Sequence, residues 1–432
     1  MNYQTALDFL NSLVNYEKRK RQDRRFKLNG IRRFLLLAEN PQKRLKNCIL
    51  IAGTKGKGSV AYMVAAGLRA CGLKTGLFVS PHLISVRERI QINGEWIKRE
   101  RFARLMSRFQ PLVKKQRVSY FELLTAMAFD FFAREEVDFS VIEVGLGGRL
   151  DATNLCEPKI AVITRIGYDH LQVLGTTLKK IAREKAGIMR PEIPVVIGLQ
   201  EPEAENELLL QATEIGAQSV LVKNRSRVWD ETITPLGIAF SAFTELGAGR
   251  VELKVLGRHQ IENCRTALTV LGILARQEPR IDFARAVAGI KNLVIPGRCE
   301  VVQESPLVIV DSCHNPESGQ ALAGVLKEYL KEKVVLIYGS LRNKLVKRTV
   351  EPIAPYVDTA VLVAPNSPRA LTPRVLKGIL TRLKVAAETA PDLKTALTRA
   401  QELSFGRMPI VIAGSFYLAG EALSLLKGIE PE

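Results

Sequence analysis

Histidine and paired cysteine are both scarce in this sequence, and the shortage narrows the functions to consider. The chain has four histidines and six cysteines in 432 residues. The cysteines are scattered singly and no Cys-x-x-Cys pair occurs, so neither a zinc site nor a disulfide framework is indicated. We expect most of these thiols to lie in the core.

Long apolar runs and excess acidic residues are missing as well. No apolar segment approaches the ~20 residues that cross a bilayer, and residues 1–5 show no basic segment followed by an apolar one. Lys and Arg number 63 against 44 Asp and Glu, a net charge of +19. We therefore expect a cytoplasmic protein without a membrane partner that binds anions: nucleotides, nucleic acid or polyacidic small molecules.

One stretch, residues 18–27, concentrates the positive charge, with seven Lys and Arg among its residues. A nucleic-acid-binding arm is one interpretation, but the cations are not regularly interleaved with aromatic residues, since Phe26 alone stands among them, and no known module accompanies them. We favour a solvated loop or one edge of an anionic substrate site, and nucleic acid is not the expected partner.

Apolar strand-like runs alternate with helical runs, which predicts an α/β protein with a mostly parallel sheet covered by helices. The strand-like runs are 48–53, 75–80, 138–144, 159–164, 194–198 and 218–222. The helical runs are 3–16, 31–38, 59–71, 99–115, 120–134, 177–186, 203–213 and 259–276. Residues 236–256 are more typical of a β-hairpin.

A break at Pro296-Gly297 separates this region from a second α/β region. Strands are expected near 306–311, 333–338, 357–363 and 409–414, and helices near 316–330, 345–353, 372–382, 392–403 and 416–427. We predict two domains, residues 1–295 and 298–432. A cleft between two such domains is a common place for a two-substrate site.

The most informative segment is residues 48–59, CILIAGTKGKGS, which predicts a strand, a phosphate-binding loop and a helix. Glycines let backbone N–H groups wrap a phosphate, and the helix N-terminus adds positive potential. Lys57 can reach the outer phosphates and Ser59 can hold Mg2+. The loop departs from the common G-x-x-x-x-G-K-[ST] pattern because Ile51 and Gly58 occupy two of its fixed positions. This shorter spacing favours one branch of ATP-using enzymes over a plain glycine-rich turn.

Polar residues follow other predicted strands. Glu143 ends the strand 139–142, where the carboxylate of a parallel strand points into the ligand crevice and suits Mg2+ or a water molecule. Its alternative role is to cap the next turn. His170, beside Asp169, leaves a second strand, and both a metal or phosphate role and a structural one stay open.

Lys185 and the segment 311–316 complete the candidate residues. Taken from the residues alone, Lys185 in the last turn of a helix is a partner of the helix dipole. Asp311 at a strand end and Asn315-Pro316 at the start of a helix can hold a ribose or order a phosphate. The alternative, Asn315 as N-cap and Pro316 as first helical residue, explains these two residues but not Asp311 and His314.

In this order these segments resemble the folylpolyglutamate synthase/dihydrofolate synthase family, relatives of the Mur ligases, from about residue 3 to the C-terminus. The other segments that carry the resemblance are 80–83 (SPHL), 87–90 (RERI), 119–126 (SYFELLTA), 143–154 (EVGLGGRLDATN), 166–170 (IGYDH), 184–188 (EKAGI), 296–298 (PGR) and 311–316 (DSCHNP). The resemblance implies a P-loop-type ATPase domain with a mostly parallel sheet, followed by a smaller Rossmann-like domain that carries glutamate-ligase function.

The resemblance also implies roles for individual residues. ATP contacts are implied for Thr54, Lys55, Gly56, Lys57, Gly58, Ser59, Asn263, Arg298 and Asp311. Mg2+ at two sites is implied for Ser59, Ser80, Glu143, His170 and Lys185, the last as a carbamate, and a monovalent cation is a further candidate cofactor. The pterin-bearing substrate is implied at Phe121, Glu122, Asp151 and Asn154. The implied catalytic residues are Lys57, Glu143, His170, Lys185 and His314, with His314 near the incoming glutamate.

The implied reaction is ADP-forming amide ligation by a monomeric enzyme: L-glutamate joins dihydropteroate or a reduced folate through an acyl phosphate. Two departures stand out: Lys55 replaces the Asn of the family loop GTNGKGS, and Asn343-Lys344-Leu345 replaces an Asp-Lys-Asp element. Two alternatives stay open. One is a related ligase with another carboxylate acceptor, and the other is a non-catalytic nucleotide- or nucleic-acid-binding homologue.

Overall fold

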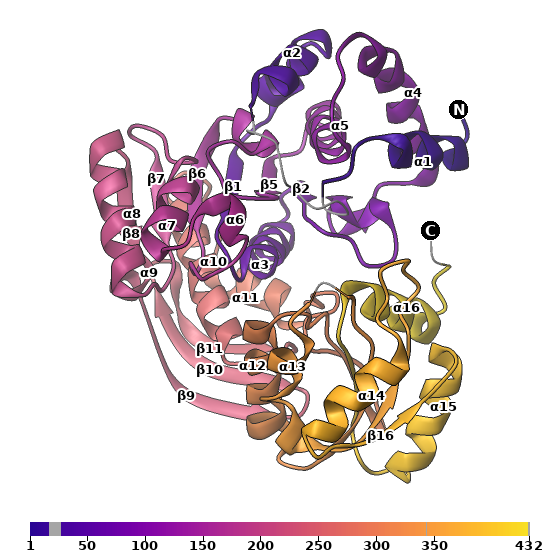
Figure 1. Cartoon of the computed structure of the whole chain (residues 1–432). Coiled ribbons are helices and arrows are strands. Elements are labelled where there is room, and N and C mark those ends of the chain that lie inside the picture. Colours follow the sequence, from indigo (N-terminus) through magenta and orange to yellow (C-terminus); the bar gives the residue numbers. More distant parts are fainter. Residues whose placement is uncertain (17–26, 343, 431–432) are drawn as a thin grey trace.

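The computed structural model describes residues 1–16, 27–342 and 344–430 (Figure 1). Most of the basic stretch 18–27, and Asn343, therefore lie outside the described residues. Two α/β regions face each other, with the N-terminal region in indigo to pink and the C-terminal region in orange to yellow.

An eight-stranded sheet organises the N-terminal region, in the order β4-β3-β2-β5-β1-β6-β7-β8. The strands from β2 to β8 in this order are parallel, while β3 and β4 form an antiparallel edge. The strands are β1 Cys48–Ala52, β2 Thr75–Phe78, β3 Ile90–Ile92, β4 Glu95–Trp96, β5 Phe139–Glu143, β6 Pro158–Ile163, β7 Pro194–Ile197 and β8 Gln218–Leu221.

Helices cover both faces of this sheet. Within β1, Ile49 and Ile51 join one apolar core while Leu50 joins the other, because successive side chains of a strand point to opposite faces. The first core contains α3 Lys57–Ala70, α10 His259–Ala275 and α11 Phe283–Lys291. The second contains α1 Tyr3–Ser12, α2 Asn29–Leu37, α4 Arg99–Lys115, α5 Tyr120–Arg134, α7 Leu178–Ala186 and α8 Pro202–Ile215. Short helices α6 Leu171–Leu174 and α9 Val222–Arg225 connect strands and helices.

A small antiparallel sheet follows, with the order β11-β10-β9. Its strands are β9 Ser226–Thr234, β10 Gly237–Thr244 and β11 Gly247–Leu253. The hairpin expected at 236–256 corresponds to β10 and β11, and β9 adds a third strand. Most of β9 is exposed, so it lacks the apolar run that marks a buried strand.

The C-terminal region has a six-stranded sheet in the order β12-β13-β17-β14-β15-β16, parallel except for β12. Its strands are β12 Glu300–Glu304, β13 Leu307–Val310, β14 Val334–Tyr338, β15 Val357–Leu362, β16 Ala386–Thr389 and β17 Ile410–Ala413. Its α-helices are α12 Pro316–Val325, α13 Val346–Val350, α14 Pro373–Arg382, α15 Leu393–Ser404 and α16 Phe416–Lys427. The predicted α/β class, with a second and smaller sheet domain, is confirmed.

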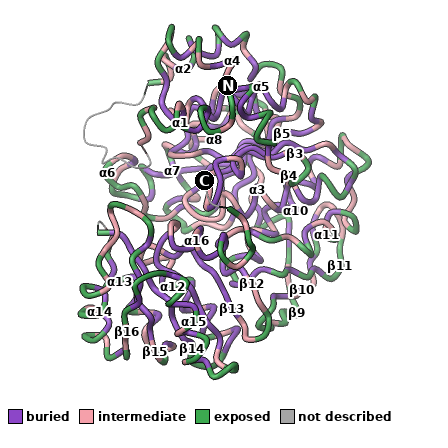
Figure 2. The backbone as a smooth tube through the Cα atoms, turned by 90° about the vertical axis from the view of Figure 1, so that its right-hand side faces the viewer, coloured by how far each residue is buried: buried purple, intermediate pink, exposed green. Residues whose placement is uncertain are grey.

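The central strands of both sheets are buried (Figure 2). This burial explains why they read as continuous apolar runs rather than alternating ones. None of the helices among the described residues is long and apolar enough to cross a membrane. The domain boundary at 295–298 stays a prediction.

Candidate active site

A cleft of about 3520 Å³ lies between the two regions. From the N-terminal region it is lined by the loops that follow β1, β2, β5 and β6, which are four adjacent strands of the large sheet. The carboxyl ends of parallel strands meet at one edge, and this edge is where open α/β sheets bind ligands. From the C-terminal region the lining includes Arg298, Asp311, His314 and Phe416.

The loop between β1 and α3 is held in one conformation by the loop after β6. The backbone N–H groups of Thr54 and Lys55 donate to the carbonyl of Arg165, at 2.9 and 3.1 Å. Gly56 has φ +86°, and a Cβ placed on it would lie 2.2 Å from Oδ1 of Asn263. The turn therefore requires glycine both for its dihedral angle and for its close approach to Asn263.

After this turn α3 begins at Lys57, and residues 56–59 line the cleft. The first N–H groups of a helix have no partner within the helix and carry partial positive charge. The cleft therefore presents amide donors, the Lys57 ammonium and the Ser59 hydroxyl together. This combination suits a polyphosphate.

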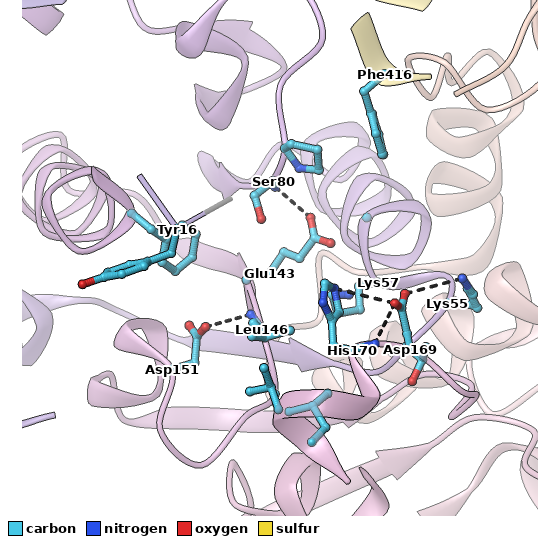
Figure 3. Close-up of a pocket in the computed structure, with 18 of the residues that line it drawn as sticks. Tyr16, Lys55, Lys57, Ser80, Glu143, Leu146, Asp151, Asp169, His170 and Phe416 are labelled. Atoms are coloured by element: carbon cyan, nitrogen blue, oxygen red, sulfur yellow. Dashed lines mark hydrogen bonds and ion pairs between the residues drawn. The ribbon is translucent and has the colours of Figure 1, made fainter. Parts of the chain in front are cut away.

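Glu143 and Ser80 meet beside this helix start. Glu143 is the last residue of β5, and its Oε2 accepts the N–H of Ser80 at 3.0 Å (Figure 3). A Cβ placed on Gly58 would lie 3.5 Å from the same oxygen. Burial raises the pKa of the Glu143 carboxyl above its ordinary value, and the positive charge of Lys57 offsets only part of this rise. A buried carboxylate beside hydroxyl groups and a phosphate loop is a chemically suitable cation ligand.

Asp169 and His170 follow β6. The His170 side chain is 55% exposed, and its Nε2 lies 3.7 Å from Oδ1 of Asp169. Oδ2 of Asp169 lies 3.7 Å from the Lys55 ammonium (Figure 3). Among the described residues, no group of three or more His, Cys, Asp and Glu side chains is arranged to hold a metal ion. A metal here would therefore depend on hydroxyl oxygens, on single acidic or histidine side chains, or on a modified residue.

Lys185 is buried at the end of α7 and is not among the residues that line the cleft. Its ammonium donates a hydrogen bond to the carbonyl of Gly53 at 2.8 Å, so it supports the start of the phosphate loop. Burial and the nearby charge of Lys57 lower the pKa of Lys185 to about 7. Lys185 is therefore more than a partner of the helix dipole, because about half of it is a neutral amine near pH 7.

Arg298 and Asp311 form a fixed group on the C-terminal side. Arg298 donates to the Ser312 hydroxyl at 2.7 Å, and its guanidinium lies 5.5 Å from the ring centroid of Phe416. The two carboxylate oxygens of Asp311 each accept a backbone N–H at 2.8 Å, from Cys299 and from Cys313. Both side chains are therefore held rigidly at the cleft.

His314 packs on the same aromatic ring. Its ring centroid lies 4.9 Å from that of Phe416, and its Nδ1–H donates to the carbonyl of Ser312 at 2.9 Å. Burial, with the charge of Lys344, lowers the pKa of His314 to about 4. His314 is thus neutral near pH 7, and Nε2 is the hydrogen-bond acceptor of the ring.

Most of the side chains predicted to bind the pterin make contacts with neighbouring residues of the protein itself. Phe121 packs against Gly145, and Glu122 accepts the Ser119 N–H at 2.7 Å to complete a capping box. Asp151 accepts the Leu146 N–H at 2.9 Å, and Phe121, Glu122 and Asp151 all line the cleft.

Asn154 lies outside the cleft lining. It donates to the carbonyl of Gly187 at 2.9 Å and accepts a hydrogen bond from Arg190 at 2.8 Å. Its visible role is to hold the loop 145–154 against the end of α7.

Several cleft residues were not predicted from the sequence, among them His259, Glu317 and Phe416. His259 opens α10 one turn before Asn263, a spacing that places both on one helix face and was available in the sequence. Phe416 opens the helix after β17, the strand end beside β13 and β14. Glu317 had no local signal because its partner lies in the other region of the chain.

Two family models together match most of this chain. The Mur ligase middle domain model matches residues 51–271, and the model of the Mur ligase glutamate ligase domain matches residues 297–416. A dihydrofolate synthase/folylpolyglutamate synthase of Mycobacterium tuberculosis is 33% identical, over 94% of this chain and 91% of that protein.

Solved structures agree with this match. A folylpolyglutamate synthase of M. tuberculosis complexed with ADP superposes with a TM-score of 0.89 at 33% identity, and the match covers 100% of this chain and 99% of that chain. An FPGS complex with AMPPCP and folate gives a TM-score of 0.84 at 27% identity, covering 99% of this chain and 100% of that chain.

A phosphate loop at the edge of a parallel sheet, facing a second α/β domain across a cleft, defines an ATP-dependent, ADP-forming ligase of the Mur ligase class. Within that class, the chain belongs to the folylpolyglutamate synthase/dihydrofolate synthase family.

Proposed function

We propose that this ligase adds L-glutamate to dihydropteroate or to a reduced folate, with ATP converted to ADP and phosphate. The observation that carries the proposal is the pairing of two half-sites across one cleft. One half holds residues 56–59 with Ser80 and Glu143, and the other holds Arg298, Asp311 and His314. A nucleotide that spans both halves would place its terminal phosphate beside an acceptor carboxylate.

In the first step, a carboxylate oxygen of the acceptor attacks the terminal phosphorus of ATP, and the bond to the β-phosphate oxygen breaks. The products are an acyl phosphate and ADP. Lys57 and the amides at the start of α3 neutralise the charge that spreads over the transferred phosphoryl group. Arg298 lines the cleft from the C-terminal region, and its positive charge acts on the carboxyl of Glu143.

In the second step, the neutral amine of glutamate attacks the acyl carbon, phosphate leaves, and the proton that the amine loses passes to the leaving phosphate as the amide forms. His314 is neutral, with Nε2 as acceptor, so it can receive a hydrogen bond from the incoming amine. A base with a pKa of about 4 is weak, so its proposed role is to orient the amine. Lys344 and Arg369 also line the cleft and offer positive charge for the carboxylates of glutamate.

The side chains at the cleft supply part of the oxygen and nitrogen ligands that Mg2+ needs. Ser59, Ser80 and the buried Glu143 would hold one ion, and His170 with Lys185 would hold a second once the lysine carries a carbamate oxygen. When bound, Mg2+ supplies positive charge to the phosphate oxygens and orients them. The lowered pKa of Lys185 supports carbamate formation, because only a neutral amine attacks carbon dioxide.

The acceptor assignment draws on the folate in the related complex and on the lining by Phe121 and Asp151. The test is ADP formation by the purified protein with ATP, Mg2+ and L-glutamate, comparing dihydropteroate with tetrahydrofolate. We expect ADP release that requires both glutamate and one of the two acceptors. ADP release without glutamate would contradict the proposed reaction, and activity only with an unrelated carboxylate would reassign the acceptor.

Two variants serve as controls for the site. Lys57→Ala and Glu143→Ala should each lower kcat by about 100-fold or more, since each removes a charged group aimed at the transferred phosphoryl or its cation. Full turnover by either variant would show that the reaction takes place elsewhere.

A further inference from the structure

Lys55 and Glu317 connect the two walls of the cleft. Lys55 lies in the phosphate loop after β1, and Glu317 lies in the first turn of α12 in the C-terminal region. The Lys55 ammonium is 3.1 Å from Oε2 of Glu317 and 3.7 Å from Oδ2 of Asp169. One cation therefore links the loop after β1, the loop after β6 and a helix of the opposite region.

Glu317 also packs directly on the N-terminal wall. A Cβ placed on Gly167 would lie 3.8 Å from Oε2 of Glu317 and 3.8 Å from the methyl group of Thr54. The Glu317 carboxylate therefore lies beside Gly167 as well as beside Lys55. These neighbours place the N-terminus of α12 next to the phosphate loop.

The position of α12 matters because the helix directly follows the segment that carries Asp311 and His314. Asn315 is its N-cap and hydrogen bonds to Ser318 within the first turn, so the helix start is rigid. Fixing Glu317 against Lys55 therefore sets the position of the C-terminal half-site over the phosphate loop.

Lysine is the unusual residue at this position. The family loop usually carries Asn, which is uncharged and shorter. In this chain, an Asn at position 55 would leave the carboxylates of Asp169 and Glu317 without this cation. The Lys55 side chain is 37% exposed and those of Asp169 and Glu317 are 35% and 43% exposed, so each ion pair is partly screened by water. The expected effect is consequently a modest change in ligand affinity rather than a change in folding.

We propose that Lys55 is a positioning residue: it holds the C-terminal half-site against the phosphate loop through Glu317 and does not itself contact the nucleotide. This inference rests on the proposed nucleotide site. It replaces direct ATP contact by the Lys55 side chain, the role that family resemblance implied, with a role between the two regions.

The test is a double-mutant cycle in ADP affinity, measured by calorimetry on the full chain. Lys55→Gln and Glu317→Gln should each weaken ADP binding about two- to fivefold at low salt, as expected for partly exposed ion pairs. The affinity of the double variant for ADP should be no lower than that of whichever single variant binds ADP less tightly, because both changes break the same contact. Raising the ionic strength should shrink the difference from the wild type.

Further variants distinguish this role from a direct nucleotide contact and from a general effect of interdomain ion pairs. Lys55→Arg should retain most of the affinity, because it keeps the charge. Glu328→Gln is the matched control: Glu328 pairs with Arg258 at 2.7 Å, also between the two regions but outside the cleft lining, and ADP affinity should be unchanged. In turnover, Lys55→Gln should raise KM for ATP by a similar factor with kcat at saturating ATP nearly retained.

Several results would overturn the proposal. If the losses from Lys55→Gln and Glu317→Gln multiply in the double variant, the lysine acts on the nucleotide and not through Glu317. An equal loss in Glu328→Gln would mean that any interdomain ion pair has this effect. Failure of the wild type to bind ADP would instead refute the proposed nucleotide site, and this inference with it.

Discussion

The low pKa of Lys185 predicts selective carbamylation. At a pKa of about 7, half of the side chain is neutral at pH 7, whereas a lysine with the ordinary value of 10.5 is neutral in only about one molecule in three thousand. The reactive amine is thus more abundant by about a thousandfold. The product keeps one N–H on Nζ, so the hydrogen bond to the Gly53 carbonyl can persist.

The assay is exposure of the protein to 13C-labelled bicarbonate, chemical trapping of carbamates and peptide mass spectrometry. Because burial lowers the pKa, the neutral form increases as pH rises through about 7, so labelling of Lys185 should rise steeply from about pH 6 to about pH 8. Lys180, an exposed lysine of the same helix, is the internal control. Lys185→Arg should abolish the signal, since arginine stays protonated.

Labelling of Lys185 no stronger than that of Lys180 would refute the argument from burial. Labelling that does not change between about pH 6 and pH 8 would refute it too, because the neutral fraction of the amine changes most in that range. If Lys185 is labelled but Lys185→Arg keeps full turnover, the carbamate forms without serving the reaction.

Two further predictions concern the loop and the cleft. Gly56→Ala should weaken ADP binding at least tenfold and destabilise the fold by about 1–3 kcal/mol, because its Cβ would lie 2.2 Å from Oδ1 of Asn263. The control is Gly72→Ala, which has φ +78° and nothing within 4 Å of its Cβ, so it should show only the cost of the backbone dihedral angle. Calorimetry measures the ADP affinity and urea unfolding measures the stability. The pKa of His314 is lowered from 6.5 to about 4, so the unfolded chain binds more protons in this interval and stability falls as pH drops through it. His314→Asn should reduce that fall by roughly 1–2 kcal/mol, after allowance for partial exposure. An unchanged pH dependence of unfolding would contradict a half-buried, neutral imidazole.

Buried parallel strands were predictable because they leave a continuous apolar run in the sequence. The runs at 48–53 and 138–144 became β1 and β5, wholly buried. Several exposed or edge strands left no such signal: β9, β12 and β16 were not predicted, and their residues are partly or largely exposed. The edge strand β8 is also partly exposed, but its residues were predicted as a strand at 218–222. Their strand conformation depends on pairing with distant neighbours, which the local pattern does not record.

Some residues of the candidate site could likewise be predicted from the sequence, and others could not. Glu143 and Asp311 were found because a polar residue directly follows an apolar run. The sequence could not reveal that Asp311 is held by the amides of Cys299 and Cys313, or that Glu122 and Asn154 are used within the loops. Nor could it pair Lys55 with Glu317, since only the docking of two regions brings them together.

The anchoring of Arg298 has an evolutionary consequence. Residues 297–299 are tied to residues 311–313 by four hydrogen bonds: Ser312 N–H to the Gly297 carbonyl, Arg298 to the Ser312 hydroxyl, and both the N–H and the thiol of Cys299 to Asp311. The arginine is therefore held to the C-terminal region, and we expect any bending between the two regions to occur before residue 297. Recombination at this point would transfer Arg298, Asp311 and His314 together. In a chain that carries Lys55, only a transferred segment with an acid at position 317 would form the ion pair between the two regions again.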